Sequence, residues 1–473
     1  MIKKKTDIFS ETDGKTVAIV GFGVSNLPLV KMLANRGKCV KITVYDKKSC
    51  EELGSEAIAL KESGVEFVYG FDNLCGDIIF RSPGFRPDRA EFVGAISGGA
   101  ALTSEMEMFL KYTPASTFAI TGSDGKTTTT TLTGKFLSCL KNTYVGGNIG
   151  TPLLDKCKDM SENDAAVLEL SSFQLMNMPY APDFSAITNI SPNHMDWHTS
   201  EQEYAEAKYN IVGDNTKRLV VNAECKQTFD FGKKILAETQ KEVFFFSSKR
   251  SSYSEVIGDK NERAKLFCLC DGAISVNDGE SVDKVLDVDS IILPGMHNVE
   301  NYMTAIALTY GFANNDIYKS IAESFGGVEH RLELVREYKG VKYYNSSIDS
   351  SPTRTAAALS ALLGKDIVVI CGGYDKNLDY APLADALLKS VRAVVLTGAT
   401  APKIKKALLE NAEYSKSNIT VVETESFEDA VAKASELGRE GGCVLLSPAS
   451  ASFDRFNNFM ERGIYFKELV NKL

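Results

Sequence analysis

A short polar motif, GSDGKT at residues 122–127, has the residue types of a phosphate-binding loop. Its members are Gly122, Ser123, Asp124, Gly125, Lys126 and Thr127. Glycines let backbone N–H groups turn inward around a phosphate, lysine adds a positive charge, and the hydroxyl of Thr127 or Thr128 can bind Mg2+. The motif is shorter than a full Walker loop, because Ile120 stands where its first glycine would be. An apolar run at 118–120 precedes it, so we expect a strand that leads into a nucleotide-phosphate site.

Five consecutive threonines, 127–131, begin at the last residue of the motif. Threonine is a poor helix former because its branched Cβ restricts χ1. Leu132, Phe136, Leu137 and Leu140 nevertheless fall on one helical face, which predicts a helix buried on that side. The strand before the loop and the helix after it favour a phosphate site over the alternative, a surface turn of Gly and Thr.

Polar residues end the strand-like runs that come next. Glu169 closes an apolar run at 165–170 and could hold a metal ion, the alternative being a solvated carboxylate at a sheet edge. The following run, 184–190, leads into the loop that contains His194. A lone histidine is more often structural than a ligand. Because parallel strands present their carboxyl ends at one edge, we expect His194 near Glu169 and Lys126.

The composition restricts the class of protein. Of 473 residues, 44% are hydrophobic and 24% charged, which is typical of a globular protein of two to four domains. The net charge of −9 argues against binding to nucleic acid. We find no apolar run near the ~20 residues of a membrane helix and no apolar segment after the N-terminal lysines, so neither a membrane span nor a signal peptide is expected. The ten cysteines have no paired C-x-x-C spacing and are expected to be reduced, which favours the cytoplasm.

The strand and helix rhythm predicts an α/β protein of three domains, 1–113, 114–327 and 328–473. We expect Rossmann-like first and last domains and a central P-loop-type domain with a mostly parallel sheet. Residues 241–292 are expected to form an antiparallel insertion, and 451–463 a helix. In the first domain, Gly21-x-Gly23-x-x-Asn26 mimics a dinucleotide-binding turn, but its third glycine is replaced, so it is weak evidence for NAD.

The motifs GSDGKTT, GGNIG, ELSSFQL, NISPNHMD, AEAK, GMHN and HRLE occur in an order that resembles the Mur ligases. These are ATP-dependent amide-forming enzymes that build the cytoplasmic precursor of peptidoglycan. The resemblance covers almost the whole chain, and the joint order of seven motifs is specific where each alone is not. It implies ATP as a substrate, two Mg2+ ions, and a lysine that reacts with carbon dioxide to form a carbamate.

The resemblance also implies roles for particular residues. Catalytic roles fall to Lys126, Asn148, Glu169, His194 and Lys208, the last as the carbamate. Metal ligands are Thr127, Glu169, His194 and Lys208. The ATP contacts are Gly122, Ser123, Asp124, Gly125, Lys126, Thr127, Thr128, Asn298, Asn301, Arg331 and Ser346. The UDP-linked substrate is expected to meet Val24, Ser25, Asp46, Lys47, Gly84, Asn148 and His194. The D-glutamate contacts are Ser350, Lys376, Ser452, Phe453 and Phe459.

Some of these assignments have local alternatives. Ser200-x-x-Glu203 predicts a capping box, so Lys208 lies about two turns into a helix, where a solvated lysine is the ordinary interpretation. Ser452 could be an ordinary helix N-cap as well as a ligand contact. Where the family commonly has an aspartate that meets the ATP ribose, this chain has Ser346, with Asp349 three residues later. Either Asp349 substitutes or the contact is weakened.

The implied function is ATP-dependent addition of D-glutamate to UDP-N-acetylmuramoyl-L-alanine through an acyl phosphate, by a cytoplasmic monomer that binds neither nucleic acid nor membrane. One alternative is another Mur-type or folylpolyglutamate-type amide ligase. A second is an NAD-dependent oxidoreductase built on the first domain. A third is a non-catalytic nucleotide sensor.

Overall fold

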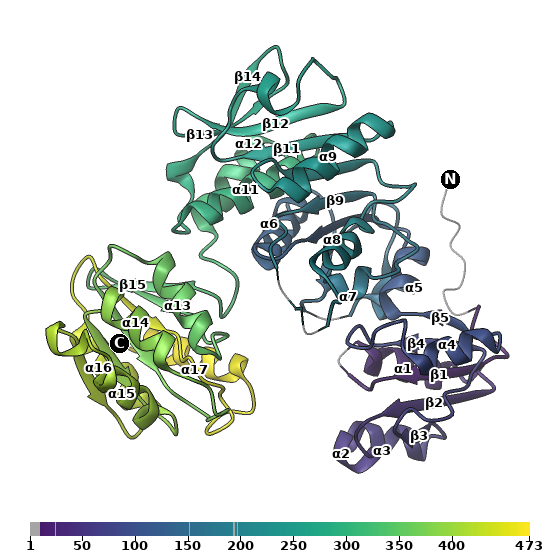
Figure 1. Cartoon of the computed structure of the whole chain (residues 1–473), viewed down its shortest axis with the longest axis horizontal. Helices are drawn as coiled ribbons and strands as arrows, with labels where there is room; N and C mark the ends of the chain where they lie inside the picture. The colour runs from purple at the N-terminus through teal and green to yellow at the C-terminus, as the bar shows by residue number, and fades with distance from the viewer. Residues whose placement is uncertain (1–9, 24, 151, 193, 196) are drawn as a thin grey trace. The chain divides into compact units, whose positions relative to one another are not determined.

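The computed structural model describes residues 10–23, 25–150, 152–192, 194–195 and 197–473. The chain forms two compact units. The first contains the residues up to 290 together with 297–322, and the second contains 291–296 together with 323–473. The first unit holds two sheets and the second holds one (Figure 1).

The first sheet of unit 1 has five parallel strands in the order β3-β2-β1-β4-β5. Its strands are β1 (Thr16–Val20), β2 (Lys41–Asp46), β3 (Glu66–Tyr69), β4 (Ile78–Arg81) and β5 (Ala101–Thr103). Its helices are α1 (Asn26–Arg36), α2 (Cys50–Leu53), α3 (Ser55–Glu62), α4 (Ala90–Ser97) and α5 (Glu105–Tyr112). The apolar run of β1 is buried and lies at the centre of this sheet, as expected for a strand covered on both faces.

The second sheet of unit 1 has nine strands in the order β14-β13-β12-β11-β10-β9-β6-β8-β7. The strands are β6 (Ser116–Thr121), β7 (Thr143–Gly147), β8 (Ala165–Glu169), β9 (Phe184–Ile187), β10 (Arg218–Asn222), β11 (Glu242–Ser247), β12 (Ala264–Cys270), β13 (Ala273–Asn277) and β14 (Val282–Asp287). The helices are α6 (Lys126–Ser138), α7 (Ser172–Leu175), α8 (Glu201–Tyr209), α9 (Lys226–Glu238), α10 (Tyr253–Val256), α11 (Met296–Thr309) and α12 (Asn315–Ser324).

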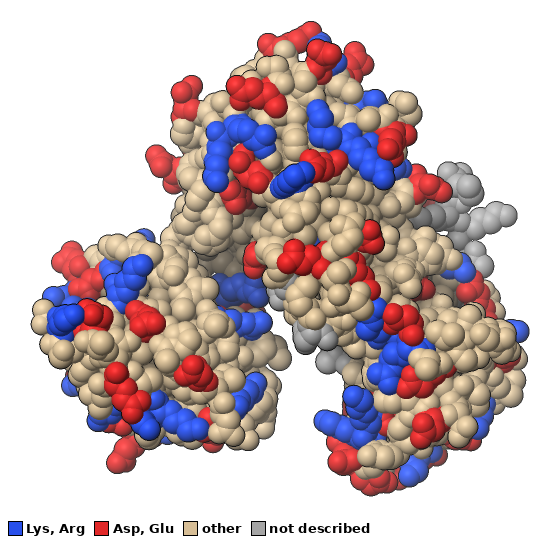
Figure 2. All heavy atoms as spheres, viewed as in Figure 1, with Lys and Arg blue, Asp and Glu red and all other residues tan. Residues whose placement is uncertain are grey.

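The expectation for residues 241–292 is only half right. β11 and β12 continue the parallel sheet, and the antiparallel pairing involves β12, β13 and β14. The segment therefore extends the central sheet instead of forming a separate insertion. Acidic and basic side chains are interspersed over the visible surface of this part, in keeping with the mixed composition (Figure 2).

The threonine run is helical from its first residue, because α6 begins at Lys126. Thr131 Oγ1 and Thr133 Oγ1 each donate to the carbonyl four residues earlier, at 2.8 Å, so these hydroxyls are satisfied within the helix. Leu132, Phe136 and Leu137 are fully buried as expected. Leu140 is 45% exposed because it lies past the end of the helix, so the expectation for this residue is wrong. Tertiary packing of one apolar face overrides the poor propensity of threonine.

Unit 2 has one sheet, in the order β15-β16-β20-β17-β18-β19, in which all neighbours except β15 and β16 are parallel. The strands are β15 (Glu333–Tyr338), β16 (Val341–Asn345), β17 (Ile367–Cys371), β18 (Ala393–Leu396), β19 (Thr420–Glu423) and β20 (Cys443–Leu446). The helices are α13 (Pro352–Ala361), α14 (Ala381–Ser390), α15 (Ala401–Glu410), α16 (Phe427–Leu437) and α17 (Phe459–Asn471).

Two features of unit 2 differ from the sequence expectations. The antiparallel edge strand β15 was not anticipated, because its charged residues hide the strand pattern. The helix expected over 451–463 begins only at Phe459, with Asn458 as its N-cap. Ser452 instead begins a turn, its carbonyl accepting from Arg455 and Phe456 N–H groups, so the helix N-cap interpretation of Ser452 is wrong.

The α/β fold class with largely parallel sheets is confirmed. Among the described residues, no helix is both long enough and apolar enough to cross a membrane.

Candidate active site

The phosphate loop connects β6 to α6 and requires its glycines. Gly122 and Gly125 have φ angles of 147° and 78°, which side chains other than glycine rarely adopt. A Cβ atom on Gly122 would collide with Thr188 Oγ1, and one on Gly125 with Asn301 Oδ1. The loop is thus both left-handed and tightly surrounded, as expected where backbone N–H groups must approach a ligand.

The loop is held in shape by its neighbours. Ser123 N and Asp124 N both donate to Asn189 Oδ1, at 3.1 and 2.9 Å. Lys126 Nζ donates to the carbonyls of Gly122 and Ser123, at 2.9 Å each. The ammonium group of Lys126 therefore lies against the loop, where it can pair with an incoming phosphate.

A carboxylate, a hydroxyl and an amide meet beside the loop. Glu169, at the end of β8, is 2% exposed. Its Oε2 accepts from Thr127 Oγ1 at 2.8 Å, and its Oε1 accepts from Asn148 Nδ2 at 2.8 Å. The alternative of a solvated edge carboxylate for Glu169 is therefore wrong. The structure brings these three expected residues together because β6, β8 and β7 are neighbours in the sheet.

The donor set beside the loop fits Mg2+. Hydroxyl and carboxylate oxygens are its preferred ligands, and it is usually held by one or two carboxylates completed by substrate phosphates and water. Across the described parts of the chain, no group of three or more His, Cys, Asp or Glu side chains could hold a metal ion by itself. Thr127 and Glu169 could thus contribute two ligands to a site that a bound phosphate would complete.

Lys208 lies under the phosphate loop and is not a solvated lysine. It is 1% exposed, and its Nζ donates to the carbonyl of Gly122 at 2.9 Å. Nζ also lies 4.4 Å from the centre of the Tyr204 ring. Burial, with a further contribution from the nearby Lys126 charge, lowers the pKa of Lys208 to about 7. The side chain is therefore a partly neutral amine at physiological pH, which an exposed lysine is not.

Asn301 lies against the phosphate loop. Thr129 Oγ1 donates to Asn301 Oδ1 at 3.3 Å, and Asn301 Nδ2 donates to Asn298 Oδ1 at 3.2 Å. Both asparagines come from α11, far along the chain, and are buried. His194 lies in the loop after β9, and its ring packs edge-on against Phe173 with centroids 5.0 Å apart.

The residues expected to meet the UDP group lie around the first turn of unit 1. Val24 lies outside the described residues, Lys47 is exposed and Ser25 lines a small cavity with Pro83. Both oxygens of Asp46 accept from the backbone, Oδ2 from Phe22 N at 2.7 Å and Oδ1 from Lys48 N at 3.0 Å.

Asn26 explains the missing third glycine of this turn. Its Nδ2 donates to Gly21 O at 2.9 Å and to Ser82 Oγ at 3.0 Å, so the side chain braces the turn against the loop after β4. Gly84, in that loop, has an exposed position and accepts from Trp197 Nε1 at 3.0 Å.

In unit 2, the surroundings of Ser346 and Asp349 bear on which of them could contact the ATP ribose. Ser346 is buried, and its Oγ accepts from Leu332 N at 3.2 Å, while Arg331 beside it is exposed. Asp349 is 7% exposed and accepts from Ser447 Oγ at 2.8 Å. Burial raises the pKa of Asp349 to about 6. The carboxylate of Asp349 is directed into the protein, which argues against its taking over a ribose contact.

The structure brings part of the expected D-glutamate set together. Lys376 Nζ lies 5.8 Å from the ring centre of Phe453, which is 59% exposed. Ser452 is buried and Ser350 half-buried. Phe459 begins α17, and its carbonyl accepts from Ser347 Oγ at 2.8 Å, so it lies beside the 346–350 loop.

Arg462 was missed from the sequence, where an arginine on a helix is ordinarily solvated. It is 2% exposed, and Nη1 donates to the carbonyls of Ser450 and Ala451 at 3.1 and 3.0 Å. Nε and Nη2 donate to Ser347 Oγ and O, at 3.0 and 2.8 Å. Arg462 thus ties together the two loops that carry Ser350 and Ser452.

The phosphate loop, the carboxylate at the neighbouring strand end and the buried lysine define a nucleotide-phosphate-binding α/β protein. Two family models match the chain: the Mur ligase middle domain over residues 120–309 and the Mur ligase, glutamate ligase domain over residues 330–450. The chain belongs to the Mur ligase family, whose members are ATP-dependent amide ligases. This assignment does not support the oxidoreductase alternative.

Relatives match along their whole length. A protein of Ruminiclostridium cellulolyticum named UDP-N-acetylmuramoylalanine--D-glutamate ligase is 44% identical, with 100% of both chains covered. One of the same name from Clostridium beijerinckii is 46% identical, again over 100% of both chains.

Solved structures share the fold at low identity. UDP-N-acetylmuramate-alanine ligase from Thermotoga maritima has a TM-score of 0.55 at 18% identity, covering 97% of this chain and 99% of its own. MurF from Acinetobacter baumannii, in its crystal structure II, has a TM-score of 0.55 at 15% identity, covering 98% and 93%.

Proposed function

We propose that this chain uses ATP to join D-glutamate to UDP-N-acetylmuramoyl-L-alanine. The choice of substrates rests on the full-length relatives that carry this name. The observation that carries the chemistry is the position of Lys208, a buried and partly neutral amine directly beneath the phosphate loop. We propose the domain boundaries 1–113, 114–327 and 328–473, and a monomer acting in the cytoplasm.

The reaction follows from the charges of the reactants. A carboxylate is a poor acyl donor, so the alanine carboxylate first attacks the γ-phosphate of ATP, ADP leaves, and an acyl phosphate forms. Lys126 offsets the charge on the transferred phosphoryl group. The amine of D-glutamate then attacks the acyl carbon, a tetrahedral intermediate forms, and phosphate leaves as the amide bond is made. Cleavage of the phosphoanhydride bond of ATP supplies the driving force.

Thr127 and Glu169 would hold one Mg2+ next to the phosphates, and His194 with a modified Lys208 would hold a second. Bound Mg2+ would neutralise negative charge on the phosphoryl oxygens. Asn148 donates to Glu169 and so fixes the orientation of that carboxylate. Its second expected role, contact with the reacting carboxylate, is consistent with this position beside the loop.

We propose that Lys208 reacts with carbon dioxide to form a carbamate. The neutral amine attacks carbon dioxide, a new N–C bond forms and one proton is released, so a neutral group becomes a negative one. Starting from the ammonium form, two protons are released in all. Because the pKa of Lys208 is about 7, a large fraction of the amine is neutral at physiological pH and able to react. A carbamate provides the oxygen ligands that Mg2+ prefers.

The remaining assignments follow the family resemblance. The UDP group would bind around Val24, Ser25, Asp46, Lys47 and Gly84. ATP would bind the loop together with Asn298, Asn301, Arg331 and Ser346. D-Glutamate would bind Ser350, Lys376, Ser452, Phe453 and Phe459, where the contact of Lys376 with Phe453 places a cation beside an exposed aromatic ring.

The test is phosphate release from ATP with UDP-N-acetylmuramoyl-L-alanine and each candidate amino acid. Release should require both the acceptor and D-glutamate, and should be lost in Lys126→Met. Turnover with L-glutamate or L-alanine but not with D-glutamate would refute the choice of amino acid. ATP binding without any release would support the nucleotide-sensor alternative instead.

A further inference from the structure

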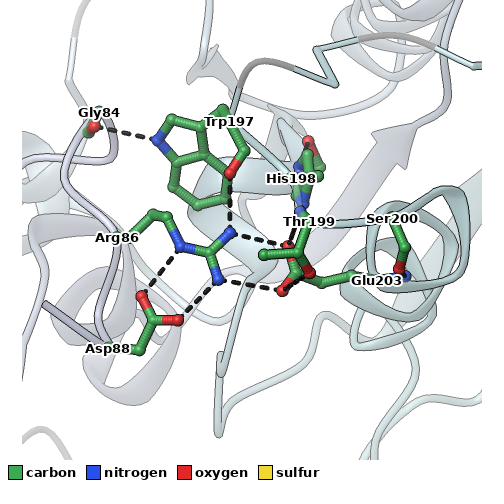
Figure 3. Close-up of polar contacts among 9 residues, drawn as sticks. Gly84, Arg86, Asp88, Trp197, His198, Thr199, Ser200 and Glu203 are labelled. Atoms are coloured by element: carbon green, nitrogen blue, oxygen red, sulfur yellow. Dashed lines mark hydrogen bonds and ion pairs between the residues drawn. The ribbon is translucent and has the colours of Figure 1, made fainter.

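Arg86 connects the loop after β4 to the nine-stranded part of unit 1 (Figure 3). Its Nε and Nη2 donate to the carboxylate of Asp88, at 2.9 and 2.7 Å. Its Nη1 and Nη2 donate to the carboxylate of Glu203 on α8, at 2.8 and 3.0 Å. Nη1 also donates to the carbonyl of Trp197, at 2.7 Å. All five N–H groups of the guanidinium are therefore used, which fixes its orientation.

A further hydrogen bond joins the same two segments, with its donor in the 197–203 segment and its acceptor in the loop after β4. Trp197 Nε1 donates to the carbonyl of Gly84, and the guanidinium carbon of Arg86 lies 5.1 Å from the indole ring centre (Figure 3). The 84–88 loop and the 197–203 segment are thus joined by a bidentate ion pair, two hydrogen bonds to backbone carbonyls and a cation–π contact.

Glu203 carries this connection towards the nucleotide site. Its Oε1 lies 3.2 Å from His198 Nδ1, and His198 Nε2 lies 2.9 Å from Ser172 Oγ. Ser172 begins α7, three residues after Glu169. Glu203 is itself in the first turn of α8, and Lys208 follows on the same helix, about 7.5 Å further along its axis.

The electrostatics favour an ionised, ordered pair. The side chains of Arg86 and Glu203 are 18% and 23% exposed, so the pair is largely shielded from water. The hydrogen bonds from Arg86 hold the pKa of Glu203 well below its usual range. Glu203 was expected to complete a capping box. Ser200 does cap α8, but the Glu203 carboxylate is directed to Arg86, Thr199 and His198.

We propose that Arg86 is a positioning residue that locks the 84–88 loop onto α8, so that the uridine end of the acceptor and Lys208 keep a fixed separation. The inference rests on the proposed function for the identity of the acceptor. The acceptor must reach from the first sheet of unit 1 to the phosphate loop. A loop free to move would still bind the uridine end, but would place the alanine carboxylate at a variable distance from ATP.

The test compares Arg86→Gln and Glu203→Gln with a matched control, Arg89→Gln. Arg89 belongs to the same segment of chain but is paired with Glu91, two residues further along the chain and 2.6 Å away. Both test variants should raise the KM for UDP-N-acetylmuramoyl-L-alanine about tenfold, while the KM for ATP stays within about twofold. The double variant should be no worse than the worse single one, because both remove the same connection. Arg89→Gln should behave as wild type.

Binding of UDP alone separates positioning from local damage. UDP is a fragment of the acceptor that ends at the first sheet, so its dissociation constant should change by less than about twofold in Arg86→Gln. Equal loss of affinity for UDP and for the whole acceptor would overturn the proposal, as would an unchanged KM for the acceptor.

Trp197 gives a readout that needs no activity, because it is the single tryptophan of the chain. Its emission should shift to the red in Arg86→Gln, since the indole loses its packing against the guanidinium. It should also shift in Glu203→Gln, where the guanidinium loses the carboxylate charge that holds it against the ring, but not in Arg89→Gln. An unchanged emission spectrum in both test variants would refute the proposal that Arg86 holds the 84–88 loop on α8. If wild type binds neither UDP nor the acceptor, the proposed function fails. The emission experiment still tests whether Arg86 holds the 84–88 loop on α8.

Discussion

Replacing the buried Lys208 with methionine should make the apo protein more stable and inactive at the same time. The pKa of Lys208 falls from an ordinary 10.5 to about 7, and one pKa unit corresponds to about 1.4 kcal/mol. Since roughly half of the amine is neutral at pH 7, keeping Lys208 in the fold costs about 4 kcal/mol at that pH. Loss of its hydrogen bond to the Gly122 carbonyl offsets about 1 kcal/mol. The net expected gain for Lys208→Met is about 3 kcal/mol.

The effect has a defined pH dependence. Between pH 7 and 10.5 the unfolded chain keeps the Lys208 proton that the folded chain has lost, so wild-type stability rises with pH in this window. The gain of Lys208→Met over wild type should therefore shrink to about 1 kcal/mol at pH 9. The measurement is the urea midpoint at pH 7 and pH 9 in buffer free of carbon dioxide. Lys226→Met, at a lysine whose side chain is 85% exposed, is the control and should show no such change.

Two results would refute the reasoning. A Lys208→Met variant that is less stable than wild type at pH 7, or whose advantage is the same at both pH values, would show that the lysine is not held neutral by burial. A variant with unchanged phosphate release would contradict the carbamate role. Short carboxylates added to Lys208→Ala should partly restore activity, because they can supply the missing oxygen ligands.

Three further changes are expected to have distinct effects. Glu169→Gln should lower phosphate release about 100-fold and raise the Mg2+ concentration needed for half-maximal rate, because the carboxylate beside Thr127 loses its charge; an unchanged Mg2+ titration would argue against a metal ligand. Arg462→Lys should raise the KM for D-glutamate about tenfold and leave that for the UDP-linked acceptor unchanged, since lysine cannot bridge both loops; equal effects on both constants would indicate general damage. Gly463→Ala should destabilise unit 2 by about 1–3 kcal/mol in calorimetry, because the new Cβ would collide with the His330 ring; a wild-type unfolding temperature would contradict this.

The sequence alone was sufficient to predict features that depend only on residues within one short segment. The sequence predicted three local features: the glycines at 122 and 125, the apolar strand before them and the buried face of α6. Strand and helix periodicities lie within one element, so the sequence shows them directly. The position of Glu169 beside Thr127 could also be anticipated, since parallel strands share an edge. Leu140 was misplaced because a periodic pattern does not reveal where a helix ends.

Interactions between distant segments could not be predicted from the sequence in the same way. Arg462 and Arg86 look like ordinary surface arginines, and only the fold supplies the carbonyls and carboxylates that surround them. Glu203 has the spacing of a capping box, yet its carboxylate pairs with the guanidinium of Arg86, a stronger, charged partner far away in the sequence. The antiparallel strand β15 was hidden because its charged residues mask the alternation of a strand.

The sequence by itself determined the phosphate loop, the order of the motifs and the α/β class, because each depends on residue types at short spacing. Only the tertiary structure decided the state of Lys208. In the sequence it is a lysine near the end of a polar helix, and on local grounds a solvated one. Its burial under the Gly122 carbonyl, 86 residues away in the chain, removes water from the ammonium group and brings the pKa near neutrality. The charge of a side chain depends on its surroundings, and those surroundings come from parts of the chain that only folding brings together.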